Sequence, residues 1–346
     1  MIKKKCFTAE WIEQVSSELH YNDKNLIEKV IRALSLLEML VKAGCPLVFK
    51  GGTALMLILG KSAHRLSIDI DLICPPGTNI EDYLKSFADF GFINLELVER
   101  KQRDDADIPK SHSKFFYQIA YRNDTDAQSY ILLDVLYEDI HYFRTQQIAI
   151  NCPFIRLEGK PLMVTVPSAE DILGDKLTAF APNTTGIPYY RNGRSCSMEI
   201  AKQLYDVGRL FENVSDLQIT KEAFRKIAVV ELSYRSFGTD IGQVFNDIRQ
   251  TALCISTRGK AGEGDFDLIQ DGIIRVKSFM YKQRYLIDHA IIDAARAAYL
   301  ATLIEKGINE IESYSNNPAD IKDMVIRPSL PNKLNKLRSN LPEAYY

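Results

Sequence analysis

The sequence predicts an α/β (α+β) fold, with a mixed sheet in the first half of the chain and a helical domain in the second. Short apolar segments alternate with helical ones up to about residue 180. From about residue 196 onward, apolar residues recur at helical spacing instead. A stretch rich in Gly, Pro and Asn, residues 182–194, separates the two patterns. We therefore expect two domains, residues 1–182 and 183–346, that form a cleft between them.

Composition narrows the class of protein. A hydrophobic fraction of 46%, a charged fraction of 25% and a net charge of −2 are typical of globular proteins and carry no overall nucleic-acid signature. The six cysteines form no C-x-x-C pair, which argues against structural zinc and favours reduced thiols. No run reaches the ~18 apolar residues of a membrane span, and the N-terminal lysines precede no apolar signal segment. We expect a cytoplasmic protein with no membrane partner.

The first predicted elements are two helices and a strand. Thr8 can cap the first helix, and Asn22 or Asp23 can cap the second, which continues to about residue 44. The apolar segment 46–49 predicts a strand that runs into a double glycine, and a short helix follows.

The turn Gly51-Gly52-Thr53 is a candidate phosphate site. Glycine lets the backbone approach a ligand closely, and the N–H groups at the start of the next helix favour an anion. By itself a G-G-T sequence is more often a tight turn than a ligand site.

The next predicted strand carries two carboxylates. Side chains alternate along a strand, so Ser67, Asp69 and Asp71 share one face while the apolar residues between them enter the core. Neighbouring carboxylates repel, and a hard divalent cation between them would relieve this. A D-x-D sequence alone is also common on solvated strands. Together with the glycine turn, in one strand–turn–helix–strand unit, it favours a bound nucleoside triphosphate with Mg²⁺.

Beyond this unit, the sequence predicts a helix over 79–90 and extended segments over 92–99, 115–121 and 130–137, with a charged loop between Arg100 and Lys110. In the last of these strands, apolar residues on both faces predict cover on both sides, and Asp134 interrupts them. A buried aspartate needs a partner. Asp134 is therefore either a third carboxylate beside the D-x-D pair or a salt-bridged or capping residue.

Two residues on later helices are ambiguous from periodicity alone. Lys176 lies inside an apolar stripe, so its ammonium either reaches solvent or binds the triphosphate. Asp206 flanks the apolar face of a helix over 196–212, where a surface pair with Arg209 is the plainer interpretation.

The rest of the chain predicts helices over 220–235, 240–256 and 266–308, followed by a tail with an excess of positive charge. The tail can bind RNA phosphates or be solvated. Its basic residues are Lys322, Arg327, Lys333, Lys336 and Arg338.

These motifs resemble those of a known family. G-G-T-A-L at 51–55, the glycine, arginine and serine at Gly60, Arg65 and Ser67, and D-I-D-L at 69–72 resemble the first motif of the nucleotidyltransferase superfamily that includes DNA polymerase beta. They are more similar to the AbiEii/AbiGii toxins of bacterial toxin–antitoxin and phage-defence systems, which include the MenT-type toxins. The threonine in place of serine and the long gap between Thr53 and Asp69 are departures typical of this branch. The resemblance covers residues 35–215.

Two later motifs extend the resemblance. Lys176-Leu177-Thr178-Ala179 matches the K-x-x-A motif of the family, and Leu204-Tyr205-Asp206-Val207 matches its L-Y-D motif. The resemblance implies a polymerase-beta-like core with the following sites. The nucleotide would be bound by Gly51, Gly52, Thr53, Arg65, Ser67 and Lys176. Mg²⁺, or Mn²⁺, would be bound by Asp69, Asp71 and Asp134.

The implied reaction transfers a nucleoside monophosphate from a nucleoside triphosphate and releases pyrophosphate. Asp134 would also receive the acceptor's hydroxyl proton, and Asp206 would orient Lys176 or assist that hydroxyl. The implied acceptor is an RNA, above all the 3′ end of tRNA, and the implied role is a growth-arresting toxin with an antitoxin encoded nearby. Alternatives are a small-molecule acceptor such as an aminoglycoside, a protein acceptor, or a binding module without activity.

Overall fold

The computed structural model describes residues 1–98, 110–121, 127–214, 216–235, 238, 240–326 and 332–346. The chain divides into two compact units. The first comprises Met1–Ser168 and Ser278–Arg284, and the second comprises Ala169–Lys277 and Tyr285–Tyr346. The expected loop over 100–110 lies, apart from Lys110, outside the described residues, and so does Arg327 of the basic tail.

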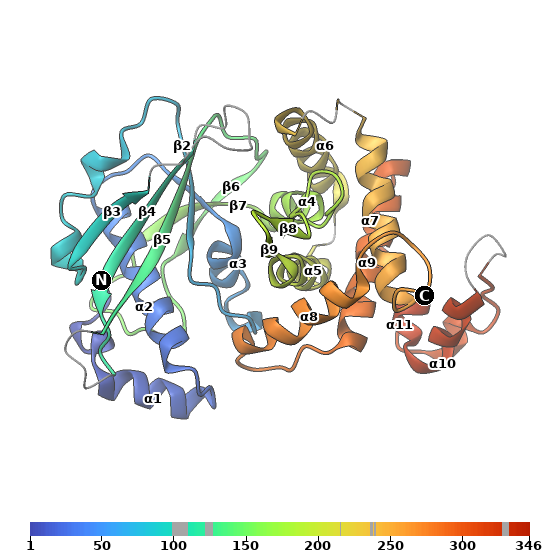
Figure 1. Cartoon of the computed structure of the whole chain (residues 1–346), viewed down its shortest axis with the longest axis horizontal. Coiled ribbons are helices and arrows are strands. Elements are labelled where there is room, and N and C mark those ends of the chain that lie inside the picture. Colours follow the sequence, from blue (N-terminus) through green and yellow to red (C-terminus); the bar gives the residue numbers. More distant parts are fainter. Residues whose placement is uncertain (99–109, 122–126, 215, 236–237, 239, 327–331) are drawn as a thin grey trace. The chain divides into compact units, whose positions relative to one another are not determined.

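The first unit contains a mixed five-stranded sheet in the order β1-β2-β5-β4-β3 (Figure 1). Strand β5 pairs parallel with β2 and antiparallel with β4, and the two outer pairs are antiparallel. A separate two-stranded sheet joins β6 and β7. The strands are β1 (Val48–Lys50), β2 (Ile70–Cys74), β3 (Asn94–Val98), β4 (Lys110–Gln118), β5 (Gln128–Tyr137), β6 (Thr145–Ala149) and β7 (Met163–Pro167). The expected mixed sheet is confirmed.

Three α-helices accompany the sheet: α1 (Ala9–Leu19), α2 (Lys24–Lys42) and α3 (Gly51–Leu59). The predicted caps are present, because Thr8 accepts a hydrogen bond from the backbone N–H of Trp11 and Asp23 accepts one from that of Leu26. Helix α2 contacts β2 and β5, and its buried residues form one hydrophobic core with the inward side chains of the sheet. The helix expected over 79–90 is two short 3₁₀ helices instead, Ile80–Tyr83 and Phe87–Phe90.

Strand β5 differs from its prediction in one respect. Ile131, Leu133 and Val135 are buried, while Leu132 and Asp134 on the opposite face are half-buried. The expected cover on both faces is therefore wrong. The alternation is that of a strand with one core face and one more open face.

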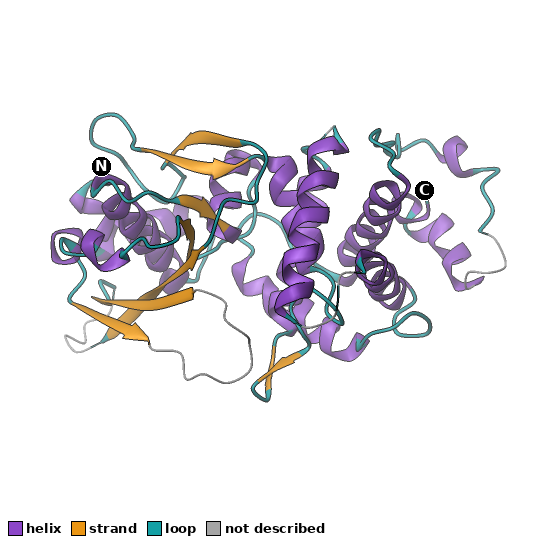
Figure 2. Cartoon of the chain, turned by 90° about the horizontal axis from the view of Figure 1, so that it is seen from above, coloured by secondary structure: helices purple, strands orange, loops and turns teal. Residues whose placement is uncertain are grey.

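The second unit is helical. Its elements are α4 (Ala169–Ala179), α5 (Ser197–Phe211), α6 (Leu217–Tyr234), α7 (Ile241–Ser256), α8 (Phe266–Val276), α9 (Ile287–Lys306), α10 (Leu337–Asn340) and α11 (Pro342–Tyr345). Among the described residues of this unit, strands are limited to the short pair β8 (Tyr190–Arg191) and β9 (Arg194–Ser195) (Figure 2). In the part of the chain that is described, no helix is long and apolar enough to span a membrane.

The units divide the chain at Ser168, earlier than the boundary expected at 182/183. Helix α4 belongs to the second unit because it packs closely against α6. A Cβ added to Gly174 of α4 would lie 2.8 Å from the backbone nitrogen of Phe224 and 2.9 Å from the carbonyl oxygen of Thr220. The predicted helical segment 266–308 is also interrupted, and its part Ser278–Arg284 belongs to the first unit.

Candidate functional site

Helix α3 begins directly at the double glycine. Its N-cap residue is Lys50. Among the described residues, the side chain of Lys50 forms no capping hydrogen bond with the helix. Gly51 has a φ of +77°, in the left-handed region that favours glycine. The first backbone N–H groups of a helix lack partners within the helix, and the helix dipole makes this end positive. The start of α3 therefore has the polarity that an anion site would need, and phosphate binding at this turn stays a prediction.

Among the described residues, three side chains lie against this turn. Asp71 of β2 lies against Gly51, since a Cβ added to Gly51 would collide with its Oδ2. Gly52 is equally confined: an added Cβ would lie 2.7 Å from Oγ of Ser67 and 2.9 Å from Nη2 of Arg65. Arg65 is buried, and it donates a hydrogen bond from Nη1 to the carbonyl oxygen of Leu66 at 3.0 Å. The structure thus brings both glycines together with Asp71, Ser67 and the guanidinium of Arg65.

The side chain of Thr53 points away from the turn into the protein. It is fully buried, and its hydroxyl donates a hydrogen bond of 2.7 Å to the carbonyl oxygen of Asp69. The side chain therefore ties α3 to the segment leading into β2. Any contribution of Thr53 to phosphate binding falls to its backbone.

A row of charged residues crosses four strands of the sheet. The register pairs Lys50 of β1 with Asp71 of β2, Asp71 with Asp134 of β5, and Asp134 with His112 of β4. Register partners project from the same face of a sheet, so these four residues form what we call the charged row. Nδ1 of His112 lies 2.5 Å from Oδ1 of Asp134. Two adjacent carboxylates are thus flanked by a lysine on one side and a histidine on the other.

Asp69 differs from the other two carboxylates. Strand β2 begins at Ile70, so Asp69 precedes the regular alternation that was expected to align it with Asp71. Among the described residues, no group of three or more His, Cys, Asp or Glu side chains is arranged to hold a metal ion. The structure therefore sets Asp71 and Asp134 opposite each other, and metal binding by Asp69, Asp71 and Asp134 stays a prediction.

The remaining predicted residues, Lys176 and Asp206, lie in the second unit and pair with each other. Nζ of Lys176 on α4 lies 3.1 Å from Oδ2 of Asp206 on α5, and it donates a hydrogen bond of 2.9 Å to Oε1 of Gln203. Both charged side chains are buried, with 8% and 2% of their side-chain surface exposed. Lys176 therefore does not extend into solvent.

Arg209, which the plainer interpretation of the sequence paired with Asp206, lies beside other carboxylates. Arg209 lies 2.9 Å from Glu212 and 3.3 Å from the buried Asp293 of α9. Of the two roles considered for Asp206, its position beside Lys176 favours orienting that lysine.

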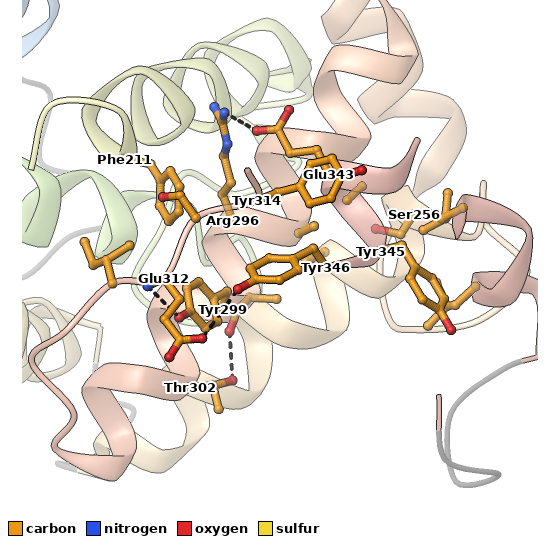
Figure 3. Close-up of a pocket in the computed structure, with 18 of the residues that line it drawn as sticks. Phe211, Ser256, Arg296, Tyr299, Thr302, Glu312, Tyr314, Glu343, Tyr345 and Tyr346 are labelled. Carbon is orange, nitrogen blue, oxygen red and sulfur yellow. Dashed lines mark hydrogen bonds and ion pairs between the residues drawn. The ribbon is translucent and has the colours of Figure 1, made fainter. Parts of the chain in front are cut away.

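The second unit also contains a large cavity, of about 1200 Å³ (Figure 3). Tyr299, Tyr314 and Tyr346 line it together with Arg296 and Glu312, and the rings of Tyr314 and Tyr346 lie 5.7 Å apart. Among the described residues that line this cavity, none is a predicted site residue.

Sequence reasoning missed three residues of these clusters: His112, Lys50 and Gln203. His112 falls on a strand expected to start only at residue 115, so no local pattern linked it to Asp134. Lys50 could have been found, because it directly precedes the double glycine at the end of a predicted strand. Gln203 lies one helical turn before Val207, and nothing in its spacing indicates contact with Lys176.

Residues 34–316 match the family described as nucleotidyl transferase AbiEii toxin, type IV toxin–antitoxin system. No curated protein matches the chain. Two similar structures are JHP933 from Helicobacter pylori and the nucleotidyltransferase toxin MenT4 from Mycobacterium tuberculosis H37Rv. The first has 16% identity and a TM-score of 0.40, covering 89% of this chain and 95% of that one. The second has 14% identity and a TM-score of 0.42, covering 85% and 89%.

The family match spans most of the chain and includes the double glycine, both aspartates of the charged row, and the Lys176–Asp206 pair. The resemblance seen in the sequence motifs is thereby confirmed. The chain belongs to the AbiEii family of nucleotidyltransferase toxins of type IV toxin–antitoxin systems.

Proposed function

We propose that this toxin transfers a nucleoside monophosphate from a nucleoside triphosphate to an RNA acceptor, at the 3′ end of tRNA, and releases pyrophosphate. The main support for this proposal is the contact of Asp71 with Gly51. It places a carboxylate, which can bind a metal ion, against a glycine turn at a helix N-terminus, which can bind phosphate. The turn would bind the β- and γ-phosphates through the backbone of Gly51, Gly52 and Thr53. Arg65 would add positive charge, and Ser67 a hydroxyl.

The carboxylates suit a hard divalent cation such as Mg²⁺ or Mn²⁺. Mg²⁺ in phosphoryl-transfer sites is usually bound by one or two carboxylates, with phosphate and water oxygens completing its shell. Asp71 and Asp134, opposite each other in the sheet, meet that need without a third protein ligand, and Asp69 would assist. When bound, the ion would neutralise charge that develops on the transferred phosphoryl group.

The chain's own residues would then orient the reactants. The acceptor hydroxyl would attack the α-phosphorus, a new P–O bond would form, and the bond to the β-phosphate oxygen would break to release pyrophosphate. The proton of the hydroxyl would pass to the carboxylate of Asp134. Asp206 would keep the ammonium of Lys176 in position. An antitoxin encoded nearby is the partner that this family implies.

The test uses each nucleoside triphosphate labelled either at the α- or at the γ-phosphate. The purified protein is incubated with deacylated tRNA, other RNA, an aminoglycoside or a protein mixture. We expect α-label but not γ-label to appear in tRNA, with equimolar pyrophosphate. Label in the aminoglycoside or in protein alone would overturn the RNA acceptor, and γ-label transfer would overturn the reaction.

Asp71→Ala is the loss-of-function control for this assay, and Lys114→Ala is its matched surface control. Lys114 also lies on the more open face of the sheet, but it is not a member of the charged row. Its ammonium lies 3.2 Å from the carboxylate of Glu96 on β3. Asp71→Ala should remove the label from tRNA, and Lys114→Ala should leave it unchanged.

A further inference from the structure

The imidazole of His112 lies next to the carboxylate of Asp134 and restrains its orientation. The antiparallel pairing of β4 with β5 sets the two residues directly opposite each other, on the face that also carries Asp71. Their side chains are partly exposed, 24% for His112 and 38% for Asp134. Their contact is therefore not forced by burial in the core but follows from the strand register.

The chemistry of the two groups defines the direction of their hydrogen bond. An ionised carboxylate only accepts, so Nδ1 of His112 must carry the hydrogen and donate it to Oδ1 of Asp134, at 2.5 Å. This bond exists whether the ring is neutral or cationic. It fixes one oxygen of Asp134 and thereby the direction of the other.

Fixing that direction matters because Asp134 stands opposite a second carboxylate. Like charges facing each other across a strand pair repel, and a freely rotating Asp134 would turn away from Asp71. A donor on the far side of Asp134 opposes this rotation. Histidine and carboxylate partners that orient a metal-binding group commonly act in this way.

A neighbouring cation does not provide the same restraint. Lys114 follows two residues later on the same face of β4, yet its partner is Glu96 on the other side of the strand. Position 112, by contrast, is the register partner of Asp134 and brings a donor next to it.

We infer that His112 is a positioning residue of the transfer reaction: its Nδ1–H holds the carboxylate of Asp134 beside Asp71 for the metal ion and the acceptor hydroxyl. This role rests on the function proposed above. His112 acts through Asp134 and makes no contact with the reacting atoms.

The experiment compares two substitutions that separate the ring from its donor. His112→Phe keeps a ring of similar volume and removes the N–H, whereas His112→Asn is smaller but places an amide N–H close to the position of Nδ1. Lys114→Ala is the matched control. Binding of Mn²⁺ is measured by electron paramagnetic resonance in the presence of a non-hydrolysable triphosphate analogue, and kcat and KM are measured with the natural triphosphate. Circular dichroism checks that each variant is folded.

We expect His112→Phe to weaken Mn²⁺ binding about 10- to 100-fold, the usual cost of losing a group that orients a metal ligand. Its kcat should fall by a similar factor while KM for the triphosphate stays close to that of the wild type. His112→Asn should restore most of both, and Lys114→Ala should match the wild type. A purely structural role would give equal losses in Phe and Asn variants.

Two results would overturn the inference while leaving the proposed function intact. One is wild-type Mn²⁺ binding and kcat in His112→Phe. The other is an Asn variant as impaired as the Phe variant. A wild-type protein that neither binds Mn²⁺ nor transfers a nucleotide would refute the proposed function, and the role of His112 with it.

Discussion

At the scale of single residues, Gly51 combines two requirements that no other amino acid meets. Its φ is positive, and the space that a Cβ would take is filled by the carboxylate of Asp71. Gly44 offers a natural comparison, because its φ of +76° is nearly the same while nothing lies within 4 Å of an added Cβ.

Gly51→Ala and Gly44→Ala should therefore lose similar stability but differ in activity. Each should lower the free energy of unfolding by about 1–2 kcal/mol through backbone strain. Only Gly51→Ala displaces Asp71, and a displacement near 1 Å can cost roughly 100-fold in rate. Denaturant unfolding and nucleotide transfer measure the two effects. Equal activity in both variants would mean that Asp71 does not act where it lies.

The hydroxyl of Thr53 connects helix α3 to the segment that leads into strand β2. Removing this hydroxyl in Thr53→Val should lower the free energy of unfolding by about 1–3 kcal/mol, because a buried hydrogen bond to the carbonyl of Asp69 is lost. Thr53→Ser keeps the hydroxyl and should retain the bond. If the Val variant unfolds at the same urea concentration as the Ser variant, the bond contributes nothing to stability.

At the scale of elements, helices α4 and α5 are joined by the buried pair Lys176–Asp206. Removing one partner leaves an uncompensated buried charge, so Asp206→Ala should lower the free energy of unfolding by about 3–5 kcal/mol. The pair Arg249–Glu305 joins α7 to α9 and is more exposed, at 31% and 39%. A double-mutant cycle on this exposed pair should give a coupling energy of only about 0.2–1 kcal/mol.

Cycles on both pairs, measured by urea unfolding, thus compare a buried and an exposed ion pair within one helical unit. Similar coupling energies in the two cycles would show that the burial of Lys176 and Asp206 adds nothing to their interaction.

The elements also show what the sequence can predict and what it cannot. Alternation within one strand predicted that Asp71 would face away from the core, whereas Asp134 was expected in a strand covered on both faces. The strand pairing sets the two aspartates opposite each other. The contact of His112 with Asp134 depends on the register of β4 with β5, and local sequence does not encode that register. Likewise, the hydrogen bond from the Thr53 hydroxyl to the carbonyl of Asp69 could not be predicted, because a turn motif does not reveal which side chains become buried.

Boundaries were predicted less well, for a related reason. Gly174 and its helix were assigned to the first domain from a Pro/Gly-rich break further along the chain. Close packing of α4 on α6, which only the folded structure reveals, places them in the second unit. The segment 278–284 lost its predicted helix because its backbone bonds to the first unit, for example from Tyr281 N–H to the carbonyl of His64.

At the scale of the whole molecule, the second unit contains a buried charge that makes stability depend on pH. Burial raises the pKa of Asp293 to about 6, although Arg209 and Arg296 act in the opposite direction. In the unfolded chain the carboxyl has its ordinary pKa near 4. Between these values the folded state holds a proton that the unfolded state has released, so stability falls as the pH rises from about 4 to 6.

Wild type and Asp293→Asn should therefore diverge across this window. Relative to the Asn variant, the wild type should lose about 2 kcal/mol of unfolding free energy between pH 4 and pH 6, as expected for pKa values about two units apart in the two states. Urea unfolding at pH 4, 5, 6 and 7 measures this difference. A difference that stays constant with pH would show that Asp293 has the same pKa in both states.

For the whole molecule, we propose that the double glycine, Asp71 and Asp134 together form a nucleotide-transferring site and that the protein acts on RNA. The most direct measurement is sequencing of RNA 3′ ends from cells that express wild type, Asp71→Ala or Lys114→Ala at equal levels. We predict added nucleotides on tRNA 3′ ends with wild type and Lys114→Ala, and unmodified ends with Asp71→Ala. Extended tRNA ends in the Asp71→Ala cells, or unmodified ends in all three, would contradict this account.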